Sequence, residues 1–301
     1  MHVAIVTDDP GWHGARLREA FAARGVTGAF SSLSTAVLRL QDVPPVVLGG
    51  FTDRLPDAVF VRGVPGGTLE QTVFQLNALH ALQDLGVPVY NDGRAIERSV
   101  DKAYTTLRLH HAGIATPPTW VTADPDVARE IVRRETARRD VRLCKPLFGS
   151  QGQGIAVVAA ACDLPDVAEV NGVWYLQRFV GERSDTATDW RVMVVGGRAI
   201  AAMRRSAPGW RANVAQGGQC QAALPEGECA RLAEAAAGCL DMAYAGVDLM
   251  RDRDGSWWVI EVNSIPAWRG LQSVCQIDIA ASLVDDLLRR CGTSRLDEVV
   301  S

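Results

Sequence analysis

The chain has 301 residues, a hydrophobic fraction of 48%, a formal net charge of −4 at pH 7 and an isoelectric point near 5.8. This length exceeds what one hydrophobic core usually sustains, so we expect two or three domains. The acidic balance gives no electrostatic footprint for binding nucleic acid or an anionic membrane surface, and neither is predicted as a partner.

The first residues, "MHVAIVTDDPGWHG", do not have the charged and long apolar regions of a secretion signal, and no apolar stretch has membrane-spanning length. We therefore expect a cytoplasmic protein. The seven cysteines form no C-x-x-C pair and are expected to be reduced thiols. They are Cys144, Cys162, Cys220, Cys229, Cys239, Cys275 and Cys291.

Strand-like and helix-like segments alternate through the first hundred residues. The apolar stretch "HVAIVT" precedes a helical stretch that ends at Gly25, and "DAVFVRG" precedes another that ends at Gly86. This alternation predicts a parallel α/β domain over residues 1–98. The turn after the first strand lacks G-x-G-x-x-G, so a dinucleotide-binding Rossmann domain is not supported.

The pattern changes near residue 100. A helix is predicted to end at Gly113, before two prolines, and another to begin with Asp124 as its N-cap. Short strands then dominate, which predicts an antiparallel α+β region. We expect a central domain over residues 99–180 and a C-terminal domain over residues 181–301.

A glycine-rich loop, "CKPLFGSQGQGI", lies between two predicted strands. Glycines let backbone N–H groups approach a ligand closely, and successive N–H groups in such turns bind anions. The loop is not a Walker A motif, because no G-K-[ST] closes it. A flexible hairpin tip is the alternative, but the preceding lysine favours a phosphate site. Its predicted members are Lys145, Gly149, Ser150, Gln151, Gly152, Gln153 and Gly154.

A two-residue turn at Gly196-Gly197 separates two further strand-like segments. Counting outward from this turn pairs Asp189 with Arg204 and places Arg191 on their face. Such a pair can be purely structural, but several arginines that face a phosphate loop would stabilise an anionic transition state. The cationic group comprises Arg191, Arg204, Arg205 and Arg211, with Asn213 two residues further on.

The strongest hairpin signal is Asp254-Gly255 in "AGVDLMRDRDGSWWVIEVNS". A two-residue turn there pairs Asp248 with Glu261, and Asn263 follows on the same face. Like charges directly opposite destabilise a sheet, and Mg²⁺ would offset this because it prefers oxygen ligands. The alternative is a surface hairpin with solvated acids. The other face is predicted to be buried and comprises Val247, Leu249, Trp258, Ile260 and Val262.

Together these motifs resemble the ATP-grasp superfamily, and specifically the RimK-like α-L-glutamate ligases. The resemblance covers about two thirds of the chain, in order: "NDGRAIERSVDKAYTTLRLHHAGIATPPTW", "KPLFGSQGQGI", "YLQRFV", "DWRVMVVGGRAIAAMRR", "GWRANVAQGG", "GVDLM" and "IEVNSIPAWRGLQ". It implies an α/β N-terminal domain followed by an α+β ATP-grasp fold with a central lid domain and a C-terminal domain.

The resemblance also implies ATP and Mg²⁺ as cofactors, usually with two ions, which Mn²⁺ can replace. Lys102 and Lys145 would hold the ATP phosphates, and loop 149–154 would close over them. The adenine hinge would comprise Gln177, Arg178 and Phe179, with Asp189 near the ribose. Arg178 stands where related ligases often have glutamate, so the adenine edge is expected to be recognised differently.

By the same resemblance, the residues expected to act on the transferred phosphate are Arg204, Arg211 and Asn213, and the metal ligands are Asp248, Glu261 and Asn263. The implied reaction is carboxylate–amine ligation through an acyl phosphate, with L-glutamate as the amine. The stretch "SIPAWRGLQ" resembles cofactor-modifying relatives, which indicates a pterin or furan C1 cofactor as the acceptor. A protein C-terminus as acceptor and a non-catalytic nucleotide-binding module remain alternatives. A homo-oligomer is compatible with the resemblance, since relatives are often dimers or tetramers.

Overall fold

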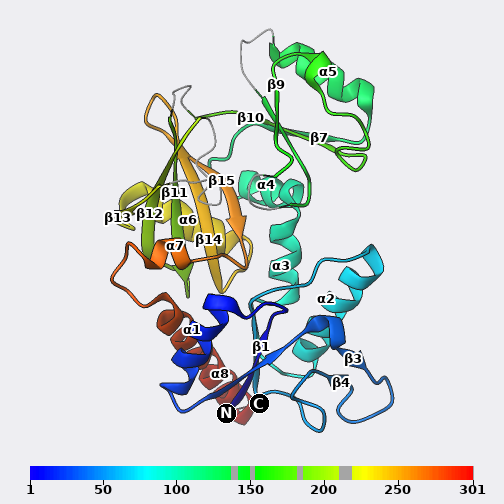
Figure 1. The fold of residues 1–301 in the computed structure, drawn as a ribbon, viewed down its shortest axis with the longest axis vertical. Helices are drawn as coiled ribbons and strands as arrows, with labels where there is room; N and C mark the ends of the chain where they lie inside the picture. Colours follow the sequence, from blue (N-terminus) through cyan, green and yellow to red (C-terminus); the bar gives the residue numbers. More distant parts are fainter. Residues whose placement is uncertain (137–141, 150–152, 182–185, 210–218, 301) are drawn as a thin grey trace.

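The computed structural model describes residues 1–136, 142–149, 153–181, 186–209 and 219–300, with residues 293–300 described by their backbone alone (Figure 1). Three main sheets follow one another along the chain: a parallel four-stranded sheet, an antiparallel four-stranded sheet and an antiparallel five-stranded sheet. This arrangement confirms the predicted α/β region followed by an α+β ATP-grasp fold. No helix in the described part of the chain is long and apolar enough to cross a membrane.

The N-terminal sheet has the strand order β2-β1-β5-β6. Its two main helices end where the sequence predicts, since Gly25 and Gly86 adopt positive φ after α1 and α2. Thr68 caps the start of α2 in a capping box, and α1 begins at Gly11, four residues before the predicted helical stretch. The elements are β1 (His2–Val6), α1 (Gly11–Ala22), β2 (Thr27–Ser31), η1 (Leu33–Thr35), β3 (Val37–Leu38), β4 (Val46–Val47), β5 (Ala58–Val61), α2 (Leu69–Asp84) and β6 (Val89–Tyr90).

Two short helices connect this sheet to the central one. Asp101 separates them, because its carboxylate accepts hydrogen bonds from the backbone of Ala103 and Tyr104 and so caps the second helix. The central sheet has the order β7-β10-β8-β9, and α5 packs on one face of it. The elements are α3 (Gly93–Val100), α4 (Lys102–His111), β7 (Thr119–Thr122), α5 (Pro125–Thr136), β8 (Arg142–Lys145), β9 (Ala156–Val158), η2 (Ala161–Asp163) and β10 (Trp174–Arg178).

The third sheet has the order β13-β12-β11-β14-β15, and α6 covers one of its faces. Figure 1 shows its edge strand β15 next to α4. The elements are β11 (Thr186–Val195), β12 (Arg198–Pro208), β13 (Gln219–Ala223), α6 (Gly227–Cys239), β14 (Tyr244–Arg251), β15 (Trp257–Asn263), α7 (Arg269–Gln272) and α8 (Ile279–Val300).

The β11–β12 hairpin corrects one predicted pairing. Val195 pairs with Arg198 across the glycine turn as predicted, but a bulge after Met193 shifts every pair beyond it by one residue. Asp189 therefore lies opposite Arg205. The predicted pairing with Arg204 was wrong because it assumed a hairpin without a bulge. Since side chains alternate along a strand, Arg204 lies on the other face.

The β14–β15 hairpin confirms the pairing of Asp248 with Glu261, but by a different route. The turn is longer than two residues, since Asp252 N donates to Ser256 O, and a bulge beside Asp248 restores the register. The predicted buried face is consequently wrong near the turn. Val259 is fully buried, whereas Trp258 and Ile260 are only half-buried.

The N-terminal and C-terminal regions share one hydrophobic core. It joins residues of β1, α1 and β5 to residues of β11, β12 and α8. Asn91 lies at this junction and is fully buried. Its Nδ2 donates to the backbone carbonyls of Tyr244 and Ser264, and its Oδ1 accepts from the backbone N–H groups of Ala243 and Tyr244. The three-domain division stays a prediction, and the shared core makes the first and third parts a single packed body.

Candidate active site

Two lysines predicted to bind phosphate lie between α4 and the central sheet. Lys102, the first residue of α4, donates from Nζ to Gly149 O at 2.7 Å, and Lys145, at the end of β8, donates to Gln177 Oε1 at 2.6 Å. Burial lowers the pKa of Lys145 to about 8, with Lys102 adding to the effect and Glu261 opposing it. Burial likewise lowers the pKa of Lys102. Two desolvated cations in reach of each other favour an anionic ligand.

A hydrogen-bond network orients Lys145. Gln177 Nε2 donates to Tyr175 Oη at 2.9 Å and to Thr119 Oγ1 at 3.0 Å, which leaves its Oε1 for the lysine. Tyr175 Oη also lies 2.7 Å from Thr106 Oγ1 of α4. The side chain of Gln177 is thus committed to holding the lysine, and Gln177 itself pairs with Thr119 and Leu143 inside the central sheet, so the adenine hinge predicted there stays a prediction.

The two acids of the β14–β15 hairpin share a face but have different partners. Asp248 accepts two hydrogen bonds from Arg191, from Nε at 2.7 Å and Nη2 at 2.6 Å, and its Oδ2 lies 3.1 Å from Arg205 Nη2. Within the described part of the chain, the side chain of Glu261 has no hydrogen bond or ion pair. The charge of Glu261 nevertheless raises the pKa of both Lys102 and Lys145, so its carboxylate lies on the side of the hairpin that is near the two lysines.

Asp189 completes a buried group of two arginines and two aspartates. Arg205 donates to it from Nε at 2.6 Å and from Nη2 at 2.7 Å. Burial alone would raise the pKa of Asp248, but Arg191 and Arg205 lower it to about 2, so this carboxylate is ionised. Burial raises the pKa of Asp189 to about 6, with the charge of Asp248 adding to the effect and Arg205 and Arg191 opposing it. An aspartate held in this way fits a structural role better than contact with a ribose.

The predicted metal ligands fit a hard cation. Asp248 keeps one free acceptor position on Oδ1, Glu261 keeps both oxygens, and Asn263 donates through Nδ2 to Gly246 O at 3.3 Å, which leaves its Oδ1 free. No group of three or more His, Cys, Asp or Glu side chains in the described ranges could hold a metal. A Mg²⁺ ion here would need Asn263, water and phosphate oxygens to complete its coordination, which is its usual preference.

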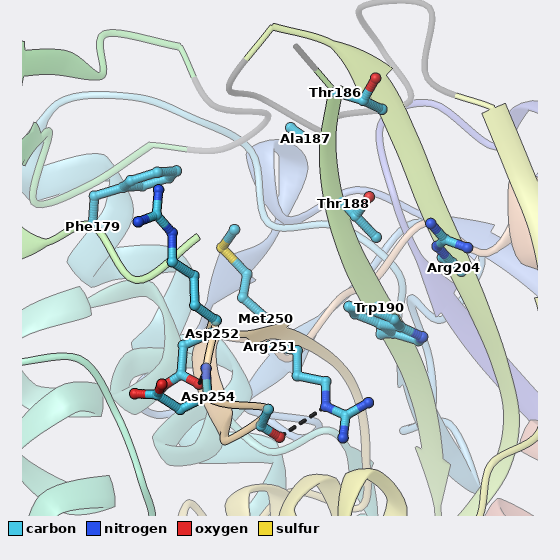
Figure 2. A pocket seen from close by; sticks show the side chains of 12 residues that line it. Phe179, Thr186, Ala187, Thr188, Trp190, Arg204, Met250, Arg251, Asp252 and Asp254 are labelled. Carbon is cyan, nitrogen blue, oxygen red and sulfur yellow. Dashed lines mark hydrogen bonds between the residues drawn. The ribbon is translucent and has the colours of Figure 1, made fainter. Parts of the chain in front are cut away.

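Phe179 lies in a cavity of about 470 Å³ at the tip of the third sheet (Figure 2). The loop beside it packs closely, since a Cβ on Gly181 would lie 2.5 Å from Met250 Cε and 2.7 Å from the Phe179 ring. A side chain at position 181 would require the Phe179 ring and the end of Met250 to move. The side chain of Arg178 lies towards α5 instead, with its Nη2 3.5 Å from Glu135 Oε2. Phe179 and Met250 therefore offer the apolar surface that an adenine ring requires.

Arg204 lies on the face of its strand opposite to the acids. It is exposed, and its Cζ lies 5.9 Å from the ring centroid of Trp190, as Figure 2 shows at the right of the cavity. The predicted position of Arg204 beside Asp189 and Arg191 was wrong, because the bulge after Met193 exchanges it with Arg205. Its predicted catalytic role depended on that position.

The remaining predicted residues divide into two groups. Gly154 has a φ of +68°, which suits a tight loop, and lies with Gln153 in the described part of the glycine-rich loop. The others lie outside the described residues: Ser150, Gln151, Gly152, Arg211 and Asn213.

Sequence reasoning missed the partners that organise the site. Arg205 was named only as part of a cationic group, and neither its pair with Asp189 nor the pair of Arg191 with Asp248 was predicted. Tyr175 and Thr106 were not identified at all. The adjacent Arg204-Arg205 was the available signal, because two successive strand residues face opposite sides and only one of them can face the acids.

These features define an ATP-grasp enzyme, and comparison with known proteins agrees. Residues 99–287 match the family model of the RimK-like ATP-grasp domain. The chain belongs to this family and is therefore a ligase of the ATP-grasp class.

Two curated relatives narrow the comparison. A tetrahydromethanopterin:alpha-L-glutamate ligase from Methanococcus maripaludis is 32% identical over 76% of this chain and 78% of its own. A probable alpha-L-glutamate ligase from Xanthomonas axonopodis pv. citri is 34% identical over 68% of this chain and 70% of its own.

A solved structure agrees on the fold. The ATP-grasp ligase PsnB, solved with a phosphomimetic variant of its minimal precursor, Mg and ADP, has a TM-score of 0.73 at 21% identity and covers 96% of this chain and 98% of its own. At this level of sequence identity, the similarity shows the fold alone. That neighbour was solved with Mg and an adenine nucleotide bound.

Proposed function

We propose that this protein is an ATP-dependent carboxylate–amine ligase that adds L-glutamate to a carboxylate of a small cofactor of the pterin or furan type. The observation that carries the proposal is the convergence of Lys102, Lys145 and Glu261 beside Asp248. The similarity to a tetrahydromethanopterin:alpha-L-glutamate ligase supports the choice of amine and acceptor.

In the proposed reaction, a carboxylate oxygen of the acceptor attacks the γ-phosphorus of ATP, and ADP leaves. The amine of glutamate then attacks the acyl carbon of the acyl phosphate; phosphate leaves with the bonding electrons, and the nitrogen loses a proton as the amide forms. The protein needs no covalent nucleophile, so its contribution is positioning and neutralisation of charge.

Each part of the site has a role in this scheme. Lys102 and Lys145 bind the phosphate oxygens, and their desolvated environment strengthens that attraction. Magnesium held by Asp248, Glu261 and Asn263 would supply further neutralisation of the phosphates, with two ions and replacement by Mn²⁺ as part of the proposal.

The arginines take different roles from those first predicted. Arg191 and Arg205 lie on the face of Asp248, fix its carboxylate and take the place of Arg204. Arg211 and Asn213 keep the roles that the resemblance implies. We also propose a cytoplasmic enzyme, which the seven free cysteines support.

The experiment that tests this proposal combines two measurements. The protein is incubated with Mg-ATP, L-glutamate and tetrahydromethanopterin; ADP release is followed by a coupled assay and the cofactor is analysed by mass spectrometry. We expect ADP release that depends on both substrates and a cofactor heavier by one or more glutamyl units.

Other outcomes separate the alternatives. Glutamyl addition to a peptide that mimics a protein C-terminus, with no change in the cofactor, would replace the proposed acceptor. Binding of ATP without ADP release for any carboxylate acceptor would indicate a nucleotide-binding module instead of a ligase.

A further inference from the structure

Two arginines and two tryptophans meet where the N-terminal sheet contacts the segment that follows the acids of the site. Arg62 directly follows β5, and its Cζ lies 5.2 Å from the ring centroid of Trp268. Arg269 lies over the ring of Trp12 in α1, with a separation of 6.0 Å. Trp268 is five residues beyond Asn263, so the chain between them spans at most about 18 Å. We call Trp12, Arg62, Trp268 and Arg269 the arginine–tryptophan cluster.

Arg62 carries a charge that has no direct ion-pair partner among the described residues. Its Nε is buried without a hydrogen-bond partner, and no hydrogen bond or ion pair to its guanidinium occurs among the described residues. Burial lowers its pKa, although Tyr244 and Asp9 oppose the shift from a distance. Arg62 is half-buried as a residue, but its Nε–H is buried, and a buried cationic donor without an acceptor is costly and is rare unless a ligand supplies that acceptor.

Trp268 adds a second unsatisfied donor at the same place. The residue is 1% exposed, and its Nε1 is buried without a partner. Indole Nε1–H can only donate, so it also requires an acceptor. Two buried donors beside each other indicate a ligand with acceptor oxygens and a negative charge.

The cluster also lies at the place where parallel sheets bind ligands. In the order β2-β1-β5-β6, the chain goes from β1 to β2 on one side of β1, and the later strand β5 pairs on the other side of β1. The crevice beyond the carboxyl ends of such a pair of strands is the usual binding position in open α/β sheets. Arg62 follows β5 at that end, and Trp12 follows β1 through the first turn of α1.

His13 fixes this geometry without adding charge. Its Nε2 accepts hydrogen bonds from the backbone of Trp268 at 3.1 Å and Arg269 at 3.3 Å, which only an unprotonated ring nitrogen can do. His13 is therefore a positioning residue that ties α1 to the segment after the acids. Arg62 and Arg269 remain as the cationic groups of the cluster.

Pro266 connects the cluster to the reaction centre. A Cβ on Gly246 would lie 2.6 Å from Pro266 Cβ, so only glycine at that position allows the segment to pack on β14. The same Cβ position lies 3.9 Å from Cδ of Arg191, which holds Asp248. Pro266 thus links the segment that carries Trp268 and Arg269 to the strand that carries Asp248.

We propose that the arginine–tryptophan cluster binds a carboxylate that does not react, on one of the two substrates of the ligase. This inference rests on the proposed function for the identity of the substrates. The guanidinium of Arg62 offers paired N–H donors that match a carboxylate, and Trp268 Nε1 offers a third. The carboxylate belongs either to the incoming amino acid, as its α-carboxylate, or to the acceptor, as a second acidic group.

The first experiment needs no catalytic activity. Thermal unfolding of the wild type, Arg62→Met and Arg18→Met is measured in glutarate and in acetate. Arg18 is a matched control, because it lies over the ring of Phe30 at 5.3 Å in the same domain but outside the cluster. We expect glutarate to raise the Tm of the wild type and of Arg18→Met by about 2–4 °C at tenfold saturation, and to leave Arg62→Met unchanged.

The Tm values without added carboxylate give an independent result. If the arginine awaits a ligand, Arg62→Met should not lower the Tm of the free protein, since it removes an uncompensated charge. Arg62→Lys keeps the charge and should show a reduced glutarate effect, which covers the case that the methionine variant folds poorly. Equal glutarate shifts in wild type and both Arg62 variants, or no shift in any of them, would overturn the proposal.

The second experiment assigns the carboxylate to its source. KM values for L-glutamate and for the acceptor are compared in wild type and Arg62→Lys. A rise of about tenfold or more in the KM for L-glutamate alone assigns the α-carboxylate, and a rise for the acceptor alone assigns its second acid. An unchanged KM for both substrates contradicts the subsite. Absence of ligase activity with a positive glutarate result would reject the proposed function and retain the anion site.

Discussion

Two groups of buried or half-buried arginines lie on or beside different sheets, and they differ in how their charge is neutralised. In the C-terminal sheet, Arg191 and Arg205 are fully paired with Asp189 and Asp248. Beyond the N-terminal sheet, Arg62 has no counterion among the described residues. The paired group contributes to the folded structure in the free enzyme, whereas the unpaired arginine would gain a partner from the carboxylate proposed above.

The comparison is tested most strongly at Asp248. Asp248→Ala would leave Arg191 and Arg205 buried with a single acid, and removal of one partner of a buried pair costs about 3–5 kcal/mol. We expect the free energy of unfolding in urea to fall by that amount and ADP release to be lost. An unchanged free energy of unfolding would show that the pairing does not support the sheet.

Glu261 separates catalysis from stability. Because its side chain has no partner in the described structure, Glu261→Ala should lower kcat by about 10²–10³-fold or more while the free energy of unfolding changes by less than about 0.5 kcal/mol. Coupled ADP assays and urea titrations measure the two effects. His110→Ala, at an exposed site in the last turn of α4, should change neither. Loss of turnover in the histidine variant but not in Glu261→Ala would reverse the assignment.

Lys145 extends the comparison of paired and unpaired cations. It is buried, and among the described residues its Nζ donates only to the neutral amide of Gln177. Its pKa in the free protein is about 8, below the ordinary value of 10.5, and a bound phosphate should raise it again. ATP binding should therefore take up a proton near pH 8, and affinity should fall by up to about tenfold per pH unit above it. Calorimetry in buffers of different ionisation enthalpy measures the uptake. Lys145→Arg should remove the pH dependence, and a wild-type affinity that is constant from pH 7 to 9 would contradict the assignment.

The smallest effect is expected at His13, which sits beside the unpaired arginine. Burial, with Arg62 and Arg269, lowers its pKa from 6.5 to about 4. In the unfolded chain His13 thus becomes protonated below pH 6.5, whereas in the folded protein it stays neutral until about pH 4. The stability from neutral His13 is present above pH 6.5 and is lost as pH falls towards 4. Urea unfolding of wild type and His13→Gln across this range should show a steeper decline in the wild type, and parallel curves would contradict it.

The sequence predicted those features of the site that depend on local patterns. Helix caps, glycine stops and hairpin signals were sufficient to locate α2, α5 and the pairing of Asp248 with Glu261. Short strands with few buried residues, such as β2 and β13, were missed because their stability comes from neighbours that are distant in sequence.

The errors cluster at the two β-bulges. Each bulge inserts one residue, and nothing in the local composition marks the position, since it depends on how the sheet packs against α6 and the rest of the core. One shifted residue exchanged Arg204 for Arg205 and Trp258 for Val259. Roles that depend on side-chain direction were therefore less predictable than the strands themselves.

The core shared by the first and third parts of the chain determines the order in which a ribosome-bound chain can fold. The apolar face of β1 and β5 is covered in part by Leu283, Val284 and Leu287 of α8, which are made after the middle of the chain. The described core of the central sheet is formed by residues from Ala128 to Leu176. All of these residues are synthesised well before α8. During synthesis we expect the middle of this chain to become protease-resistant before its beginning does.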